Sequence, residues 1–274
     1  MASLTDKNQT KNKSKEKQNK ITRSIKRLLC DFKHYMDTKP DLTYVSICND
    51  NAHLVKVLIF GPEGTPYHNG NFFIDLKFPN DYPYNPPKAN FLTTDGRIRF
   101  NPNLYATGKV CLSILGTWSG PGWSIVQRLS SVILSIQSLL GEHPLRNEPG
   151  YENSKVNEPK MIGYNNYVQF HTINYSIINM IKNKLYPPEF EYVVIKHFFD
   201  NYESILKNTD ELLALDNKIA STTYLSLKAK LEYKKCKEEL VSLHKYAEEY
   251  LSKTKETLDE LKETTYDGKT FKIL

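Results

Sequence analysis

The chain has 274 residues, of which 39% are hydrophobic and 25% charged, and its formal net charge is +6 at pH 7. These proportions are those of a soluble globular protein, and the length suffices for one or two domains with a substantial core. The longest nearly apolar stretch, Val132–Leu140, is far too short to cross a bilayer, which takes about 20 residues, so we predict no membrane partner. The first twenty residues have no apolar core, and we expect no secretory signal.

The number and spacing of the cysteines indicate whether the protein works in a reducing or an oxidising compartment. The spacing of the four cysteines is wide and includes no Cys-x-x-Cys pair, which argues against both a zinc site and a disulfide framework. It favours a reducing compartment, so we predict a cytoplasmic protein, with the nucleus as a second location. We expect neither a metal nor a cofactor. The cysteines are Cys30, Cys48, Cys111 and Cys236.

Residues 1–20 hold six lysines and two acidic residues, with almost no apolar side chains. Such a segment cannot bury enough surface to fold, so we predict a disordered basic tail. A tail of this charge suits RNA, an acidic protein or an anionic membrane, but a solvated tail without a dedicated partner is the simpler interpretation. We therefore predict no dedicated nucleic-acid binding.

After the tail, the apolar spacing predicts one helix and then four short strands. Steps of three and four residues place Ile21, Ile25, Leu28, Phe32 and Tyr35 on one stripe of a helix that Pro40 ends. The period then changes to that of strands joined by turns, which is typical of an antiparallel meander. The predicted strands are Thr43–Cys48, His53–Phe60, Asn71–Phe78 and Ala89–Thr93.

Two further features complete the predicted order. Prolines in residues 78–88 fix an extended loop that presents Tyr82 and Tyr84 on a stiff scaffold. A polyproline ligand for another module is the alternative, but the flanking strands favour a structural crossover.

A second helix is predicted from Ser124, which with Gln127 fits a capping box ahead of an apolar stripe. Helix, strands, loop and helix in this order predict an α+β fold.

The densest set of motifs lies between the last strand and the second helix. Arg99-Phe100-Asn101-Pro102-Asn103 is followed by Gly108-Lys109-Val110-Cys111-Leu112 and then by Trp118-Ser119. A single cysteine near an asparagine is, by default, a buried structural residue. Because several neighbours agree, we interpret Cys111 as a candidate nucleophile whose oxyanion is held by an amide donor.

This order and spacing resemble the active-site segment of ubiquitin-conjugating enzymes, which carry ubiquitin as a thioester. Their more usual His-Pro-Asn triplet is Asn101-Pro102-Asn103 here, and the Phe-Pro, Tyr-Pro and Pro-Pro pairs of residues 78–88 also match. The chain is similar above all to the long-tailed Z-type enzymes and to the conjugating domain of the giant inhibitor-of-apoptosis protein. That subgroup shares Asn-Pro-Asn and a sequence like residues 112–121. The resemblance implies the ubiquitin-conjugating fold, with an N-terminal helix, a four-stranded antiparallel meander, an active-site loop and further helices.

The resemblance also implies roles for individual residues. Cys111 is the expected thioester nucleophile, and Asn103 is the expected donor to the tetrahedral oxyanion. Asn101 and Pro102 shape the loop, and the Asn101 side chain is expected to bond turn backbone in place of the usual histidine. Glu148 is a candidate acid that orients the attacking lysine, with an ordinary loop carboxylate as an equal alternative.

The expected partners are ubiquitin or a ubiquitin-like modifier, an activating enzyme and a ubiquitin ligase. In the family, the first helix, the proline-rich loop and a Gly-Pro-Gly loop form the platform for ligases. The candidates for that platform here are Tyr84, Pro121 and Gly122.

The chain continues beyond the minimal domain. Pro159 begins a predicted helix that Pro187-Pro188 stops, and the absence of Gly and Pro from Glu189 to Asp267 predicts further helix. A long helix or helical hairpin packed on the domain is expected there, with a partner-binding coiled coil as the alternative. The predicted parts are a tail (1–20), the ubiquitin-conjugating catalytic core (21–155), C-terminal helices packed on the core (156–208) and a long helical extension (209–274).

We therefore predict a ubiquitin-conjugating enzyme. It accepts the modifier from an activating enzyme on Cys111 and transfers it to a lysine amine, usually with a ligase. A catalytically silent, ubiquitin-binding scaffold of the same fold is the alternative, although such variants typically lack the cysteine. An unrelated thiol hydrolase needs a positioned histidine, and no Cys-Gly-Ser-Cys or Gln-Ala-Cys signature is present.

Overall fold

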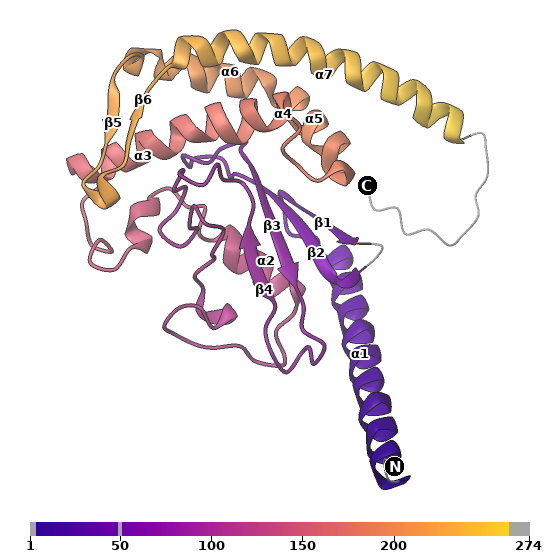
Figure 1. Ribbon diagram of the computed structural model, residues 1–274. Helices are drawn as coiled ribbons and strands as arrows, with labels where there is room; N and C mark the ends of the chain where they lie inside the picture. The colour runs from indigo at the N-terminus through magenta and orange to yellow at the C-terminus, as the bar shows by residue number, and fades with distance from the viewer. Residues whose placement is uncertain (1–3, 49–50, 263–274) are drawn as a thin grey trace.

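A computed structural model describes residues 4–48 and 51–262. A four-stranded sheet lies at the centre, with α1 at one end and the helices that follow α3 along the opposite side (Figure 1). The sheet is antiparallel throughout and its strands follow one another in chain order, so the predicted meander is confirmed. Its strands are β1 (Thr43–Cys48), β2 (Asn51–Phe60), β3 (Asn71–Lys77) and β4 (Lys88–Phe91).

Helix α1 spans Leu4–Thr38 and ends ahead of Pro40. It places Leu28, Phe32 and Tyr35 in the core, as the apolar spacing predicts. The Tyr35 hydroxyl also lies 2.8 Å from Thr43 Oγ1 at the start of β1. The end of α1 is thereby joined to the first strand.

The predicted disordered tail differs from the structure, in which residues 4–20 continue α1. The physical reason is that neither Gly nor Pro interrupts residues 4–39, and Lys, Gln and Glu are good helix formers. Extending a helix whose later turns are already packed requires no new nucleation step. Residues 1–3 of the predicted tail lie outside the described residues.

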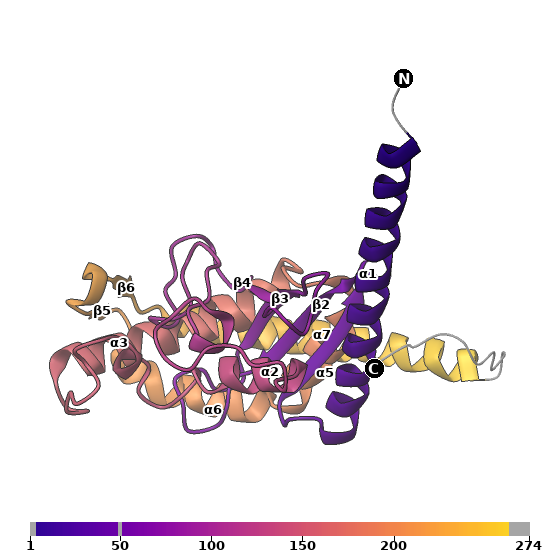
Figure 2. The ribbon, with the colours of Figure 1, turned by 90° about the horizontal axis from the view of Figure 1, so that it is seen from below.

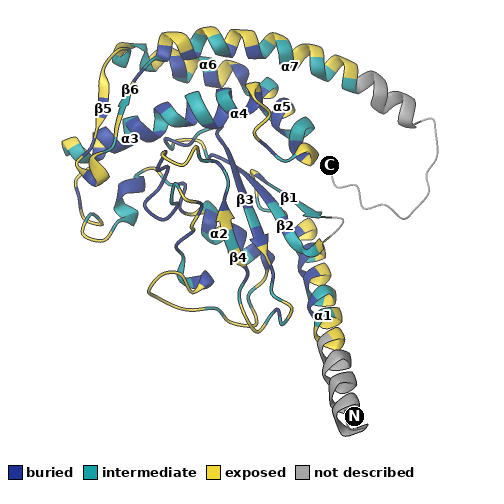
Figure 3. Cartoon of the chain, viewed as in Figure 1, coloured by how far each residue is buried: buried dark blue, intermediate teal, exposed yellow. Residues whose placement is uncertain are grey.

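Both faces of the sheet are covered, and β3 is buried over most of its length (Figure 3). Successive residues of a strand point to opposite faces. On one face Phe72 meets Phe100 of the loop after β4, with ring centroids 5.4 Å apart. On the other face the Phe73 ring lies 5.7 Å from that of Phe190, in the C-terminal part of the chain. Phe100 of the loop after β4 and Phe190 therefore lie on opposite faces of β3.

Helix α2 (Leu129–Gln137) has its N-cap at Arg128, four residues later than the N-cap Ser124 that the capping-box pattern predicts. The Ser124 N–H does donate to Gln127 Oε1 at 2.8 Å, but this contact closes a turn rather than a helix. The reason is tertiary, because Arg27 of α1 donates to the carbonyls of Ile125 (3.1 Å) and Gln127 (2.9 Å). Those carbonyls are therefore turned toward α1.

The C-terminal helices follow a loop over residues 138–158. Helix α3 (Pro159–His171) continues through a π-helical segment, Thr172–Asn179, into α4 (Met180–Lys182). Helices α5 (Glu191–Asp200) and α6 (Tyr202–Glu211) come next. Short 3-10 turns occupy Ser113–Leu115, Pro144–Asn147, Pro188–Phe190, Leu212–Leu215 and Tyr224–Ser226.

The prediction of helix throughout Glu189–Asp267 is wrong between α6 and α7. Strands β5 (Ile219–Ser221) and β6 (Lys228–Lys230) form an antiparallel hairpin there. Its turn places Leu225 and Ser226 at φ of 51° and 52°. Because these non-glycine residues adopt the left-handed conformation, the absence of Gly did not exclude a turn. The hairpin and α1 lie at opposite ends of the molecule (Figures 1 and 2).

Helix α7 (Tyr233–Lys262) returns along α5 and α6. Its stripe of Cys236, Leu240 and Ala247 is buried, and the His244 ring stacks on Tyr202 of α6 with centroids 3.9 Å apart. These residues therefore face the chain itself rather than a coiled-coil partner. Residues 263–274 of the predicted extension lie outside the described residues. Among the described helices, none has both the length and the apolarity that a membrane span requires.

Candidate active site

Cys111 and Asn103 lie opposite each other in the loop between β4 and α2. The Cys111 N–H donates to the Asn103 carbonyl at 2.9 Å, and Asn103 Nδ2 donates to the Cys111 carbonyl at 2.7 Å. Isolated bridges pair Leu104 with Val110 between them. The two residues that the sequence analysis selected, eight positions apart, are therefore held together by reciprocal hydrogen bonds.

The side chains of this pair are nearly covered. Cys111 is a free cysteine with 1% of its surface exposed, and Asn103 has 5%. Asn103 Oδ1 is buried and has no hydrogen-bond partner in the described part of the chain. Buried polar atoms are normally paired, and an unpaired one marks a site that needs an explanation.

Asn101 anchors the turn from inside. It is fully buried, and its Nδ2 donates to the Leu139 carbonyl (2.8 Å) and to the Tyr67 hydroxyl (3.0 Å). Its Oδ1 accepts from the Asn103 N–H at 2.9 Å, which is the side-chain bond to turn backbone that we expected. Burial raises the pKa of Tyr67, which stays a neutral donor to the Phe100 carbonyl. Asn101 thus ties the turn to the end of α2 and to the segment ahead of β3.

The sequence analysis missed Arg99 as a support of the same turn. Its Nε donates to the Asn101 carbonyl (3.0 Å) and its Nη2 to the Pro102 carbonyl (2.6 Å). The guanidinium carbon lies 3.5 Å from the centroid of the Tyr105 ring, in a cation–π contact. An arginine two residues before the Asn-Pro-Asn triplet was the available signal, since its planar fork suits two adjacent carbonyls.

Two residues close the loop around Cys111. Thr117 Oγ1 donates to the Val110 carbonyl at 2.7 Å and accepts from the Leu112 N–H at 2.9 Å. Gly108 has φ of 91°, and a Cβ there would lie 2.3 Å from Asn90 Oδ1. A side chain at position 108 would therefore separate the loop from β4.

Glu148 caps the short turn Pro144–Asn147, its N–H donating to the Leu145 carbonyl at 3.1 Å. Its neighbour Asn147 places Nδ2 3.4 Å from Asn101 Oδ1, so this segment touches the Asn-Pro-Asn turn. Burial raises the pKa of Tyr224, at the tip of the β5–β6 hairpin, and the charge of the Glu148 carboxylate adds to that rise. The sequence analysis did not connect Glu148 with the hairpin.

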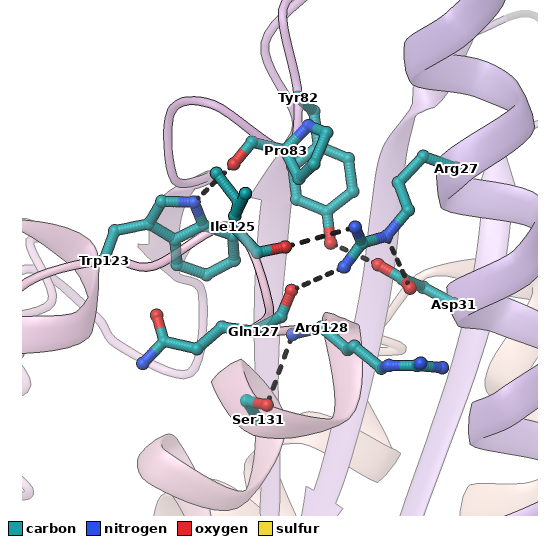
Figure 4. A network of polar contacts seen from close by, with 9 residues as sticks. All are labelled: Arg27, Asp31, Tyr82, Pro83, Trp123, Ile125, Gln127, Arg128 and Ser131. Carbon is teal, nitrogen blue, oxygen red and sulfur yellow. Dashed lines mark hydrogen bonds and ion pairs between the residues drawn. The ribbon is translucent and has the colours of Figure 1, made fainter.

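The proline-rich loop, α1 and the segment before α2 meet in one polar network (Figure 4). Asp31 of α1 accepts from Arg27 Nε at 2.9 Å and from the Tyr82 hydroxyl. Burial and the hydrogen bond to Asp31 raise the pKa of Tyr82. Trp123 Nε1 donates to the Pro83 carbonyl at 2.7 Å. These contacts fix the two loops on which the platform candidates lie.

The platform candidates themselves are exposed. Tyr84 has 75% of its surface exposed, and Pro121 and Gly122 are also exposed. Apolar neighbours on the same segment share this exposure, with 53% at Ile125 and 76% at Val126. No group of three or more His, Cys, Asp or Glu side chains among the described residues is arranged to hold a metal ion.

Comparison with known proteins agrees with the fold and the motifs. The family model described as ubiquitin-conjugating enzyme matches residues 27–184. The chain therefore belongs to the ubiquitin-conjugating enzyme family, and the α+β architecture with its meander and following helices is the fold that the resemblance implied.

Individual relatives agree with the predicted subgroup. The chain is 40% identical over 179 residues to ubiquitin-conjugating enzyme E2 Z of Xenopus tropicalis, an alignment that covers 64% of this chain and 56% of the relative. It is 43% identical over 158 residues to human ubiquitin-conjugating enzyme E2 Z, covering 56% and 44%. The predicted similarity to Z-type enzymes is thus confirmed, although the chain spans only about half the length of these relatives. Human ubiquitin-conjugating enzyme E2 G1 matches among solved structures with 29% identity and a TM-score of 0.36, over 41% of this chain and 90% of that one.

Proposed function

We propose that this protein carries ubiquitin or a ubiquitin-like modifier as a thioester on Cys111 and transfers it to a lysine amine. The observation that carries the proposal is the reciprocal pair of hydrogen bonds between Cys111 and Asn103. These bonds join the Asn103 amide to the backbone of a free cysteine, and this supports the assignment of the two residues to one site. The match of residues 27–184 to the conjugating family supports the same reaction.

The loading step exchanges one thioester for another. The Cys111 thiolate attacks the C-terminal carbonyl of the modifier, the activating enzyme's thiolate leaves, and a new thioester forms on Sγ. In the transfer step a neutral lysine amine attacks that carbonyl, Cys111 leaves as a thiolate, and the amine gives up its proton. Both steps pass through a tetrahedral oxyanion, and a fixed hydrogen-bond donor in the loop stabilises such a species.

Asn103 is the proposed oxyanion donor. Its Nδ2 carries two hydrogens, and the bond to the Cys111 carbonyl uses one of them. The second hydrogen remains for the oxyanion. The buried Oδ1, which has no partner in the described residues, fits a side chain held for a ligand rather than for stability alone.

Glu148 is proposed to orient the incoming lysine. The side chain of its neighbour Asn147 contacts that of Asn101, and this contact supports a role for Glu148 near the Asn-Pro-Asn turn. A carboxylate there attracts the amine and helps to place it for attack.

The proposed partners follow from this reaction. An activating enzyme supplies the modifier, and a ubiquitin ligase binds the exposed platform around Tyr84, Pro121 and Gly122. Large apolar side chains without a covering partner, such as Val126, support a protein-binding surface there.

The direct test is a charging assay. Incubation with activating enzyme, ATP and ubiquitin should give a product that a reducing agent removes, and Cys111→Ala should abolish it. A matched control carries Cys30→Ser, Cys48→Ser and Cys236→Ala and should charge normally. Charging that survives Cys111→Ala would refute the proposed nucleophile, and a folded protein that no modifier charges would favour the silent scaffold.

A further inference from the structure

Every main-chain carbonyl of the active-site turn (residues 99–103) accepts a hydrogen bond. The carbonyls of residues 100–103 accept from Tyr67 or from groups of the loop itself. The Arg99 carbonyl, the first of the turn, accepts from the Tyr164 hydroxyl of α3 at 2.9 Å. Tyr164 is fully buried. Helix α3 therefore fixes the start of the turn through one tyrosine.

The β5–β6 hairpin packs on α3 beside this tyrosine, although it lies beyond residues 27–184, which the family model matches. A Cβ at Gly163 of α3 would lie 1.9 Å from the Ser221 carbonyl oxygen, so only glycine permits this approach. Thr222 Oγ1 also donates to the Lys160 carbonyl at 3.2 Å. The hairpin is therefore held in one position relative to α3.

The tip of the hairpin contacts the Tyr164 ring directly. Tyr224 has 6% of its surface exposed although it lies in a turn. Its ring meets that of Tyr164 edge to face, with centroids 5.5 Å apart. The Tyr167 ring stacks on Tyr164 from within α3, at 6.2 Å. Because a close-packed ring cannot turn without displacing its neighbours, the hairpin helps to set where the Tyr164 hydroxyl points.

We propose that Tyr164 is a positioning residue of the active site. The hairpin holds its ring, and its hydroxyl holds the Arg99 carbonyl, so that the turn keeps the Asn103 amide aligned for the oxyanion. This inference rests on the proposed thioester transfer. It gives the hairpin, a segment outside the matched domain, a part in the reaction. Loss of the hydroxyl removes the donor to the Arg99 carbonyl and lets the turn move, whereas an oxyanion donor acts only from a fixed position.

The test follows discharge of preloaded thioester onto free lysine in a single turnover. Tyr164→Phe keeps the buried ring and removes only the hydroxyl. It should slow discharge about threefold to tenfold, the scale of one lost hydrogen bond, while loading from the activating enzyme stays unchanged. Tyr35→Phe is the matched control, because Tyr35 is also buried and its hydroxyl lies 2.8 Å from Thr43 Oγ1 at the start of β1. It loses a hydrogen bond too and should discharge at the normal rate.

A double-mutant cycle with Asn103→Ala separates positioning from a loss of stability. Since Tyr164 is proposed to act by aligning the Asn103 amide, Tyr164→Phe should change the rate constant less than twofold once that amide is absent. The rate constant reports only loaded, folded molecules, so a variant that is merely less stable lowers the amplitude of discharge instead. A wild-type rate constant in Tyr164→Phe would overturn the inference, and so would an equal loss with and without the Asn103 amide.

The role of the hairpin is tested without changing Tyr164. Gly163→Ala places a Cβ against the Ser221 carbonyl and displaces the hairpin, and Tyr224→Leu removes the aromatic ring at its tip. Both should slow discharge severalfold and leave loading intact. Gly141→Ala is the matched control, because a Cβ there would have its nearest contact outside the adjacent residues at 3.9 Å. Normal discharge by both test variants would overturn the role of the hairpin, whereas failure of the wild-type protein to load at all would refute the proposed function.

Discussion

The active-site turn (residues 99–103) and the platform segment (residues 118–126) are built in opposite ways. The turn buries polar side chains, with exposed fractions of 9% at Arg99, 0% at Asn101 and 5% at Asn103. The platform segment exposes apolar ones, with 40% at Trp118, 53% at Ile125 and 76% at Val126. Globular proteins usually do the reverse. Both regions depart from the usual distribution of side chains, and the comparison indicates where function constrains the sequence.

The two regions also differ in what holds them. Side chains hold the turn, since Arg99 donates to the Asn101 and Pro102 carbonyls and Asn101 Oδ1 accepts from the Asn103 N–H. The platform segment is held from its back by α1, where Arg27 binds the carbonyls of Ile125 and Gln127 (Figure 4). The side chains of Ile125 and Val126 stay exposed, whereas that of Trp123 turns inward to the Pro83 carbonyl. We infer that the turn fixes atoms for chemistry and the platform segment presents a surface to a partner.

The largest effect expected from this comparison follows loss of the Asn103 amide. Asn103→Ala should slow discharge of the thioester onto lysine by about 10- to 1,000-fold, the range for one oxyanion donor. Loading should be largely retained, because the activating enzyme contributes its own groups to that step. Single-turnover discharge checks this, with thermal unfolding as the measure of folding. An unchanged discharge rate in a fully folded variant would mean that Asn103 only supports the conformation of the loop.

The sequence sufficed for the meander, α1 and the Cys111–Asn103 pair because each depends on local spacing. It failed where a distant contact decides the conformation. Residues 125–127 carry a helix pattern, but Arg27 of α1 binds their carbonyls, and α2 begins later. The hairpin turn uses Leu225 and Ser226 at positive φ, which composition does not reveal.

Contacts between residues far apart in the chain were also not predicted from the sequence. Arg99 precedes the motif and was predictable in principle, whereas Tyr164 and Tyr224 reach the turn only through the packing of α3 and the hairpin. No spacing rule relates position 99 to position 224. The sequence therefore located Cys111 and Asn103 but not the residues packed around their loop.

A second variant tests whether the turn depends on its buried anchor. Asn101→Ala removes donors to Leu139 and Tyr67 and the acceptor of the Asn103 N–H. Leaving such buried groups unpaired should lower the free energy of unfolding by about 2–3 kcal/mol. Urea unfolding measures this loss. Stability equal to wild type would mean that Arg99 alone holds the turn.

A smaller change separates the charge of Arg99 from its shape. Arg99→Lys keeps the positive charge but cannot donate from two adjacent nitrogens to the Asn101 and Pro102 carbonyls. We expect a loss of about 1–2 kcal/mol in unfolding free energy, the scale of one or two hydrogen bonds, with slower discharge as the turn loosens. A lysine variant as stable as wild type would show that charge beside Tyr105 is sufficient.

The smallest effect on the isolated protein is expected at the platform segment. Val126→Ser changes a side chain that is 76% exposed, so unfolding free energy should change by less than about 0.5 kcal/mol. Loading and unassisted discharge should stay within about twofold, because no contact in the active-site turn is altered. Ligase-stimulated discharge should fall severalfold. Leu134→Ser is the matched control, since Leu134 is 49% exposed on α2 outside the platform segment and should leave stimulation intact. Equal ligase-stimulated discharge in both variants would show that the exposed apolar side chains of the platform segment do not bind the ligase. The proposed division between a turn for chemistry and a surface for a partner would then be wrong.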